Sequence, residues 1–452
     1  MLPDVALLKV FDFYEDEDHI EAWYTLVHVC SEWRNIVFGS PRRLGLRLYC
    51  NAGTPVRETL DVWPLLPVVV RSDGHEKWGV DSIIAALEHN DRISELDLLD
   101  IPSPQLEEVW AAMERPFPAL THLQLRHRDG TAPVVPASIL CGSSPRLQRL
   151  SLYRTPFPGL PKLLMSTIHL VRLDLRRIPH SGYISPEVMA SCLSVLTRLE
   201  ALVIKFESPQ RSPDRKVRRP PPRTRILLPS LTELLFFGVS EYLEDFLARI
   251  DAPLLDNLDI TFFHQLMFST PQLTQFIDRT PNFKAHDKAQ VFFSSWGVSV
   301  TLPQTLDGRL NVGISCKQPD WQLSSLAQFC SSSFPHALIP VVEHLYILEE
   351  RFPRLLWQDD IASSQWLELF HPFTAVKGLY ISREFVPRIV PALQELVEER
   401  LTKVLPSLET IFLEEPLPSG PVQEAIGRFV VSRQLVGHPI VVSPWERKFF
   451  ED

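Results

Sequence analysis

The sequence is poor in glycine, sparse in cysteine and short of long apolar runs. Only 17 of its 452 residues are glycine, so glycine-rich loops of the kind that cradle phosphates are not expected. No apolar run approaches the ~18–20 residues of a membrane-spanning helix, and the start at Met1 lacks a secretion signal. The six cysteines contain no CxxC pair, which argues against a disulfide framework. These absences predict a reduced, soluble, intracellular protein of the cytoplasm, the nucleus or both.

Recognisable catalytic motifs are missing as well. There is no nucleotide-binding glycine motif, no HExxH and no GxSxG, and the 14 histidines are dispersed. Cys30 lies in an apolar stripe, which favours a buried, inert thiol over a nucleophile. The formal net charge of −10 argues against a nucleic-acid-binding chain. We expect no cofactor, no metal and no catalytic residue; a hydrolase or transferase would need a deep pocket with convergent histidines and carboxylates.

The sequence is rich in proline, with 40 residues, and it repeats an apolar pattern. Segments of the form x-x-Leu-x-x-Leu-x-Leu recur along most of the chain. Prolines such as Pro118, Pro145 and Pro229 stand two residues before a segment, where they end the preceding helix. The middle apolar residues of the segments are Leu96, Leu123, Leu150, Leu173, Leu202, Leu234, Leu258, Leu345, Leu379 and Ile411.

The spacing of these residues fits a leucine-rich repeat. The steps are 27, 27, 23, 29, 32 and 24 residues up to Leu258, then 34 and 32 after Leu345, against roughly 20–29 for leucine-rich repeats. We therefore predict an α/β fold, a leucine-rich-repeat-like solenoid with a curved parallel sheet and outer helices, over residues 41–452. Chance leucine spacing in an ordinary α/β domain is the alternative. Helices are expected at 82–89, 105–113, 186–196, 241–250 and 392–404.

Two regions depart from the regular repeat. Ahead of the first repeat, residues 44–48 and 67–70 are expected to form two strands. Between residues 283 and 341 the register is lost. There, the alternating segments 298–302 and 310–314 are predicted to form a hairpin, with Gly308 between them.

The first forty residues carry a helical pattern instead. Val5, Leu8 and Phe11 follow one another at helical spacing. A second helical stripe is formed by Trp23, Leu26, Cys30, Trp33 and Val37. A segment this short has too little core of its own. Its apolar surface must therefore face the repeats, a partner or both.

This segment resembles the F-box. The matching residues are Leu2-Pro3, Leu7-Leu8, Val10-Phe11, Leu26, Val29-Cys30, Trp33-Arg34 and Val37. The whole chain resembles fungal F-box proteins with degenerate leucine-rich repeats, so residues 1–40 would be a small all-α F-box. The resemblance implies binding to a Skp-type adaptor, and through it to a cullin and a RING subunit. The adaptor-binding residues would be Leu2, Pro3, Leu8, Val10, Phe11, Leu26, Cys30, Trp33 and Arg34.

By this resemblance the chain would be the substrate-recognition subunit of an SCF-type E3 ubiquitin ligase. It would be a receptor and not an enzyme, with a protein substrate on its repeats and no membrane or nucleic-acid partner. The alternative is a leucine-rich-repeat scaffold or binding protein that acts without a ligase. In that case Phe11 and Trp33 would cap the core of the first repeat.

Strand alternation places one set of side chains on the concave face of the predicted solenoid. The substrate-binding residues would be Arg126, Tyr153, Arg176, Lys205, Leu235, Phe237, Tyr346, Tyr380 and Phe412. The cations are expected to form a basic ridge beside the first tyrosine, Leu235 and Phe237 an apolar patch, and the last three residues an aromatic ladder. Such a face suits a partner with acidic or phosphorylated groups next to apolar ones. Alternatively, the stacked aromatics only stabilise neighbouring strands.

Residues 209–225 stand apart as a basic, proline-rich insertion loop. Seven Lys and Arg against one Asp give this stretch a charge of 7 − 1 = +6, which leaves −16 for the rest of the chain. It lies between the repeats of Leu202 and Leu234. Besides a simple insertion, it could be a nuclear import signal, a polyproline ligand or a clamp for acidic partners.

Overall fold

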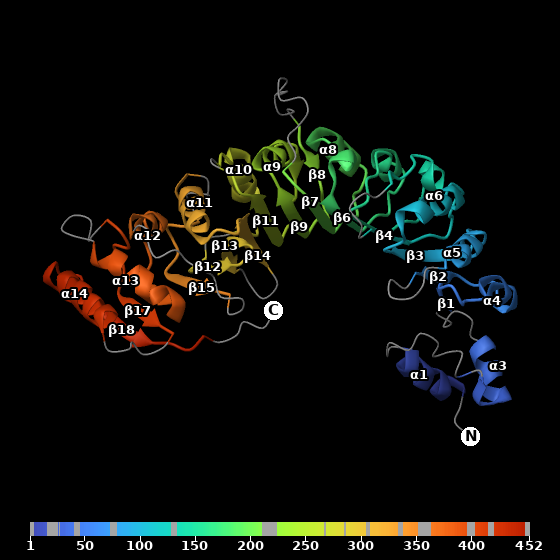
Figure 1. Cartoon of the computed structure of the whole chain (residues 1–452), viewed down its shortest axis with the longest axis horizontal. Helices are drawn as coiled ribbons and strands as arrows, with labels where there is room; N and C mark the ends of the chain where they lie inside the picture. The colour runs from blue at the N-terminus through green and yellow to red at the C-terminus, as the bar shows by residue number, and fades with distance from the viewer. Residues whose placement is uncertain are drawn as a thin grey trace. The chain divides into compact units, whose positions relative to one another are not determined.

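The computed structural model describes residues 4–15, 26, 28–39, 46–72, 79–127, 133–209, 224–265, 268–283, 286–303, 308–332, 338–350, 363–395, 403–414 and 420–447. The chain divides into two compact units. The first contains residues 1–184 and 191–201, and the second contains residues 185–190 and 202–452. Most helices and strands of both units carry their labels in Figure 1.

The sheet of the first unit is parallel and follows the order of the chain. Neighbouring strands are hydrogen-bonded in succession from β1 to β6. The strands are β1 (Leu46–Tyr49), β2 (Val68–Arg71), β3 (Ile93–Leu99), β4 (His122–Arg126), β5 (Arg149–Tyr153) and β6 (Arg172–Ile178). The predicted pair of strands before the first repeat is therefore confirmed as β1 and β2.

The repeated leucines form the core because alternate strand residues point to opposite faces. On β3, Leu96 and Leu98 are only 1% and 2% exposed, whereas Glu95, Asp97 and Leu99 are half-buried. Each fully buried leucine contributes about 1.5–3 kcal/mol relative to an exposed one. We call the face that carries the residues alternating with these leucines the open face.

Helices return the chain from one strand to the next. In the first unit they are α4 (Val56–Val62), α5 (Val80–Leu87), α6 (Ser103–Ala112) and α7 (Leu160–Leu164), with short 3-10 turns at Ile139–Gly142 and His180–Gly182. Helices α4, α5 and α6 pack on one another in succession, on the same side of β1 to β4 (Figure 1). Helix α8 (Pro186–Leu193) spans the boundary between the two units.

The sheet of the second unit is also mostly parallel. In spatial order its strands are β7 (Ala201–Phe206), β9 (Glu233–Gly238), β11 (Asn257–Phe263), β14 (Arg309–Ser315), β13 (Gly297–Pro303), β12 (Lys288–Ser294), β15 (His344–Glu349), β16 (Gly378–Ile381), β17 (Thr410–Leu413) and β18 (Val441–Pro444). A separate two-stranded sheet joins β8 (Ile226–Leu227) to β10 (Ile250–Asp251). The described parts of both units thus have the mostly parallel, helix-backed sheet of a leucine-rich-repeat-like α/β solenoid.

Strands β12 to β14 interrupt the parallel order. Strand β13 is antiparallel to both of its neighbours, β12 and β14. Strand β14 is parallel to β11, and β12 is parallel to β15. The predicted hairpin of residues 298–302 and 310–314 is confirmed, and the structure adds β12 to make a three-stranded meander whose spatial order is the reverse of its chain order.

Six helices of the described residues back the second sheet after α8. They are α9 (Ser240–Leu247), α10 (Pro271–Arg279), α11 (Pro319–Ser332), α12 (Ser363–Phe370), α13 (Val386–Gln394) and α14 (Pro421–Leu435). The buried Glu244 on α9 accepts the backbone N–H groups of Gln272 and Leu273 at 2.8 and 2.9 Å. A carboxylate thereby occupies the N-terminus of α10, where it satisfies donors that have no partner within the helix.

Four of the predicted helices are confirmed to within a few residues as α5, α6, α8 and α9. Of the helix predicted at 392–404, residues 392–394 belong to α13, residues 403 and 404 are not helical, and residues 396–402 lie outside the described residues. Helix α13 begins at Val386 and ends at Gln394, and Lys403 and Val404 lie in a turn. Pro391 misled the sequence interpretation because proline is expected at a helix start, whereas here it lies inside α13.

Candidate functional site

The open face of the first unit carries three of the predicted substrate-binding residues side by side. Arg126 on β4 is in register with Tyr153 on β5, which is in register with Arg176 on β6. The predicted ridge is therefore present for these three residues. Lys205 lies on β7, which belongs to the second unit. The ridge of the first unit therefore consists of the other three residues.

A carboxylate lies next to the Nε atom of each of the two arginines. Arg176 donates from Nε to Asp174 Oδ1 at 2.8 Å, and Arg126 Nε lies 3.6 Å from Asp100 Oδ1. The arginine side chains are 44% and 37% exposed, whereas their acids are 11% and 8% exposed. The acids therefore approach the Nε ends of the guanidinium groups while the arginine side chains remain partly in solvent.

Three strands of the first unit, β3, β5 and β6, carry a residue with a left-handed backbone at their carboxyl end. Asp100, Arg154 and Arg177 each directly follow the last open-face residue of their strands, with φ of 55°, 53° and 50°. This conformation is uncommon for residues other than glycine. Asp100 N–H donates to the carbonyl of Arg126 at 2.8 Å, and Arg154 N–H to that of Arg176 at 2.9 Å. The turn thus joins the end of each strand to the next one.

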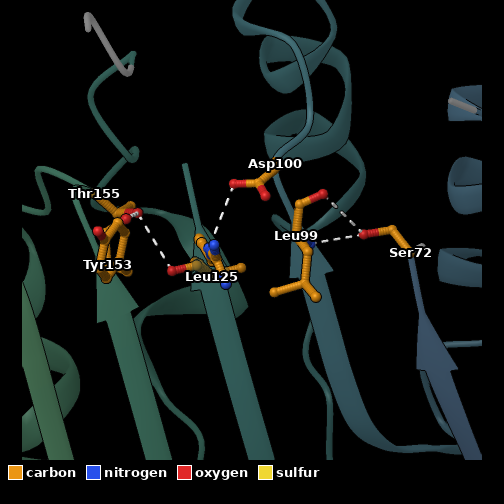
Figure 2. Close-up of polar contacts among 7 residues, drawn as sticks. Ser72, Leu99, Asp100, Leu125, Tyr153 and Thr155 are labelled. Atoms are coloured by element: carbon orange, nitrogen blue, oxygen red, sulfur yellow. Dashed lines mark hydrogen bonds and ion pairs between the residues drawn. The ribbon is translucent and has the colours of Figure 1, made fainter. Parts of the chain in front are cut away.

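Figure 2 shows these strand ends from β2 to β5. Ser72 accepts the N–H of Leu99 at 2.7 Å, and the Thr155 hydroxyl donates to the carbonyl of Leu125 at 3.5 Å. Asp100 projects between β3 and β4 toward the ion pair with Arg126. Side-chain hydrogen bonds and this ion pair therefore tie neighbouring strands together at their carboxyl ends.

The left-handed turn also redirects Arg177. Strand alternation would point it away from Arg176, yet its guanidinium carbon lies 5.5 Å from the centroid of the Tyr153 ring. The guanidinium of Arg126 is at the same distance, 5.5 Å, from that ring. Two cations thus share one aromatic ring by cation–π contact. The sequence analysis missed Arg177, although the sequence places it directly after Arg176, which was selected.

A hollow of about 310 Å³ adjoins this cluster on the open face of β2 to β6. Charged residues of both signs line it: Arg71, Glu95, Asp97, His122, Arg149, Arg172 and Asp174. Burial raises the pKa of the Asp97 carboxyl, against the opposing effect of Arg71. Burial also lowers the pKa of His122, although Glu95 lies 3.6 Å from its Nδ1 atom. The sequence analysis did not select Glu95, His122, Arg149 and Arg172, because it considered only the residues between and after the consensus leucines.

In the second unit, Leu235 and Phe237 lie half-buried on the open face of β9, as predicted. The Phe237 ring meets the Phe263 ring of β11 edge-on, with centroids 4.5 Å apart. Asp259 on β11 accepts a hydrogen bond of 2.8 Å from Asn311 on β14. The predicted apolar patch is therefore real, and a polar network lies next to it.

The predicted aromatic ladder is also present. Tyr346, Tyr380 and Phe412 stand in register on β15, β16 and β17. Their rings stack with centroids 4.1 and 4.2 Å apart and interplanar angles of 15° and 5°. Burial, together with Tyr380, raises the pKa of Tyr346 to about 12.

The chain after β18 covers part of this ladder, which the sequence analysis did not foresee. The Trp445 ring meets the rings of Tyr346 and Tyr380 edge-on, at 6.0 and 5.5 Å. Its indole N–H donates to the carbonyl of Ile381 at 3.4 Å, and Arg447 donates to the carbonyl of Glu349 at 3.0 Å. At least part of the ladder therefore has an internal, structural role.

In the N-terminal segment the structure describes two helices, α1 (Asp4–Glu15) and α3 (Ser31–Gly39). Phe11 is 4% exposed and packs on Trp33, with ring centroids 4.9 Å apart. The predicted adaptor-binding residues thus separate into two groups. Phe11 and Leu26 are buried, Leu8 and Trp33 are half-buried, and Val10, Cys30 and Arg34 are exposed.

Several predictions fall outside the residues that the structure describes. Leu2 and Pro3 precede the first described residue, and most of the basic loop, residues 210–223, is not described. The expectation that Cys30 is a buried thiol is wrong, because Cys30 is exposed between helical segments. Burial instead raises the pKa of the Cys50 and Cys330 thiols to about 12.

Among the residues that the structure describes, no group of three or more His, Cys, Asp or Glu side chains could hold a metal ion. None of its helices combines the length and apolarity needed to cross a bilayer.

No family model matches the chain, and no curated protein matches it. Among solved structures, it is similar to the leucine-rich repeat-containing protein LegL7 from Legionella pneumophila. The two share 13% sequence identity over 85% of this chain and 97% of that chain, with a TM-score of 0.28. The repeat architecture described above rests on this chain's own strand register and burial pattern.

Proposed function

We propose that the chain is a non-catalytic receptor that binds a protein substrate on the open face of its repeats. In this proposal its N-terminal helices bind a Skp-type adaptor, and through it a cullin and a RING subunit. The chain would thus act as the substrate-recognition subunit of an SCF-type ubiquitin ligase in the cytoplasm or nucleus, with no membrane or nucleic-acid partner and no cofactor.

The observation that carries the adaptor half of the proposal is exposed apolar surface on a small helical segment. Val10 and Val29 are 53% and 56% exposed, beside the internal Phe11–Trp33 contact. Both valines belong to the F-box-like pattern of the sequence. Exposed apolar side chains on a small helical segment are typical of surfaces that bind a partner.

The repeat half of the proposal rests on side chains that the sheets present on their open faces. The first unit offers arginines around a tyrosine, and the second offers the Phe237–Phe263 pair. Arginine and aromatic residues are enriched at protein–protein interfaces. Both sets lie on regular strands, which hold side chains in fixed positions.

The test is a pull-down of the full chain with a purified Skp-type adaptor. The parent should bind, and the Val10→Asp/Val29→Asp variant should lose binding, because two charges would enter an apolar interface. Val62→Asp is the matched control, since Val62 is 84% exposed at the end of α4 and lies outside the helical segment. It should bind like the parent.

If a folded parent does not bind the adaptor, the ligase role is refuted. The chain would then be a leucine-rich-repeat scaffold that acts without a ligase. The burial of Phe11 against Trp33 favours this second candidate, because it gives the two residues an internal packing role. Thermal unfolding of Phe11→Ala tests that role directly, with a loss of about 3–5 kcal/mol expected for a buried phenylalanine.

A further inference from the structure

Positive charge gathers on three neighbouring strands of the first unit. Strands β4, β5 and β6 carry five arginines and one aspartate, a balance of 5 − 1 = +4. The arginines are Arg126, Arg149, Arg172, Arg176 and Arg177. The whole chain has a formal charge of −10, so this surface opposes the overall trend and favours an anionic ligand.

The arginines of the ridge are oriented in a way that suits a ligand. The buried carboxylates of Asp100 and Asp174 lie against the Nε ends of Arg126 and Arg176. Because the acids are closest to the Nε atoms, they do not occupy the terminal amino groups, which form the fork that binds phosphate or carboxylate in bidentate fashion. The acids thus reduce the conformational freedom that a ligand would otherwise have to restrict.

Tyr153 brings a third guanidinium to the same place. Its ring lies 5.5 Å from the guanidinium carbons of both Arg126 and Arg177. Arg177 reaches the ring from a left-handed backbone with φ of 50°, a conformation that is costly for a residue other than glycine. Such strain is typical of functional positions when the surrounding structure holds it in place.

Arg149 and Arg172 place two more like charges next to each other. They are direct register partners on the same face of β5 and β6. Like charges at such positions destabilise a sheet, and Arg149 has no ion pair among the described residues. A multiply charged anion on this face would relieve the repulsion.

The shape of the surface favours a peptide over a nucleic acid. The hollow of about 310 Å³ extends across the strands from Arg149 and Arg172 on β5 and β6 to Glu95 and Asp97 on β3. These acids would repel the repeated phosphates of a nucleic acid, whereas a peptide can place one phosphoryl group on the arginines and polar or basic residues near the acids.

We propose that the open face of β4 to β6 binds a phosphorylated segment of a protein partner, with the phosphoryl group on Arg126, Arg176 and Arg177 around Tyr153. This inference rests on the proposed receptor function and specifies its substrate class. The phosphoryl group adds about two negative charges and three acceptor oxygens, which suit the two guanidinium groups over the Tyr153 ring and that of its register partner Arg176.

The test uses the full chain and a fluorescent degenerate peptide library with one fixed phosphoserine. The same library with serine at that position is the reference. We expect at least ~tenfold tighter binding of the phosphoserine library, by fluorescence anisotropy. The Arg126→Gln/Arg177→Gln variant should lose most of this preference.

Arg57→Gln is the matched control variant. Arg57 lies on α4, where its side chain is 66% exposed and pairs with Glu88 at 3.1 Å. The substitution removes a positive charge from the same unit and leaves the open face unchanged. The preference for the phosphoserine library should therefore be retained. Circular dichroism melts of all variants check that each is folded.

Three results would overturn the proposal: equal binding of the two libraries, a preference that survives in a folded Arg126→Gln/Arg177→Gln variant, or random single-stranded DNA that competes as well as phosphoserine peptide. The adaptor pull-down depends on the N-terminal helices alone. A chain that binds the adaptor and ignores phosphoserine would refute this inference and leave the proposed function standing.

Discussion

Removal of Trp445 is expected to loosen the C-terminal repeats and leave the first unit unchanged. The substitution Trp445→Ala deletes two edge-on ring contacts, to Tyr346 at 6.0 Å and to Tyr380 at 5.5 Å. It also deletes the indole hydrogen bond of 3.4 Å to the carbonyl of Ile381. These contacts join the residue after β18 to β15 and β16, so their loss should act on the strand pairing of β16 to β18.

The magnitude follows from the contacts that are lost. Each aromatic pair contributes roughly 0.5–1.5 kcal/mol, and a hydrogen bond of this kind about 0.5–1.5 kcal/mol. Trp445 is half-buried, so we expect a total of about 2–3 kcal/mol. In a repeat protein each unit contacts mainly its neighbours. The cost should therefore appear as easier local opening at the end of the sheet.

Native-state amide hydrogen exchange measures this opening directly. A loss of about 2–3 kcal/mol corresponds to roughly 30- to 150-fold faster exchange, at amides such as Val441, which donates to Glu409, and the strand amides of β17. The control is Trp296→Ala, a tryptophan that is 67% exposed at the turn between β12 and β13. It should change exchange at β17 and β18 by less than about twofold.

Two outcomes would refute the reasoning. Unchanged exchange at β17 and β18 would mean that Trp445 does not hold the last strands. Equal acceleration in both units would mean that the chain opens as one cooperative body rather than from its end.

Two further predictions concern buried ionisable groups. Because burial raises the pKa of Tyr346 from 10.0 to about 12, its neutral form stabilises the fold below about pH 10, and that stability is lost as pH rises through about 12. Tyr346→Phe should remove the latest phenol ionisation from an ultraviolet absorbance titration of the folded protein, and an unchanged curve would contradict this. Glu244→Ala leaves the N–H groups of Gln272 and Leu273 without their acceptor. It should cost about 2 kcal/mol in chemical denaturation, whereas the exposed Glu424 on α14 provides a control whose replacement by Ala should have little effect.

The regular repeats were predictable from sequence because their signal is periodic. Leu96, Leu123 and Leu150 recur 27 residues apart, and the burial of a leucine column leaves little choice of strand register. The same alternation placed Tyr346, Tyr380 and Phe412 on one face correctly. Where one residue type repeats at one spacing, local pattern and tertiary packing agree.

Features that depend on contacts between distant residues could not be read in this way. Trp445 follows the last strand with no periodic signal, and the partners of its side chain lie 64 residues or more away along the chain, as with Ile381. Arg177 reaches Tyr153 only because its backbone becomes left-handed. At Pro391 a local rule failed instead. Proline is expected at the start of a helix, but Pro391 lies inside α13.

The reversed meander of β12, β13 and β14 has a consequence for how the chain assembles as it is synthesised. A regular repeat protein can add strands one at a time, each docking on its predecessor. Here β12 is made first but lies three strand positions from β11, about 14 Å at the usual strand spacing. It has no template until β13 and β14 emerge and fill the gap. The three strands must therefore dock together, and α11 must then cross back so that β15 can pair with β12. Growth of this sheet from the N-terminus thus pauses at β11 and resumes with a block of three strands.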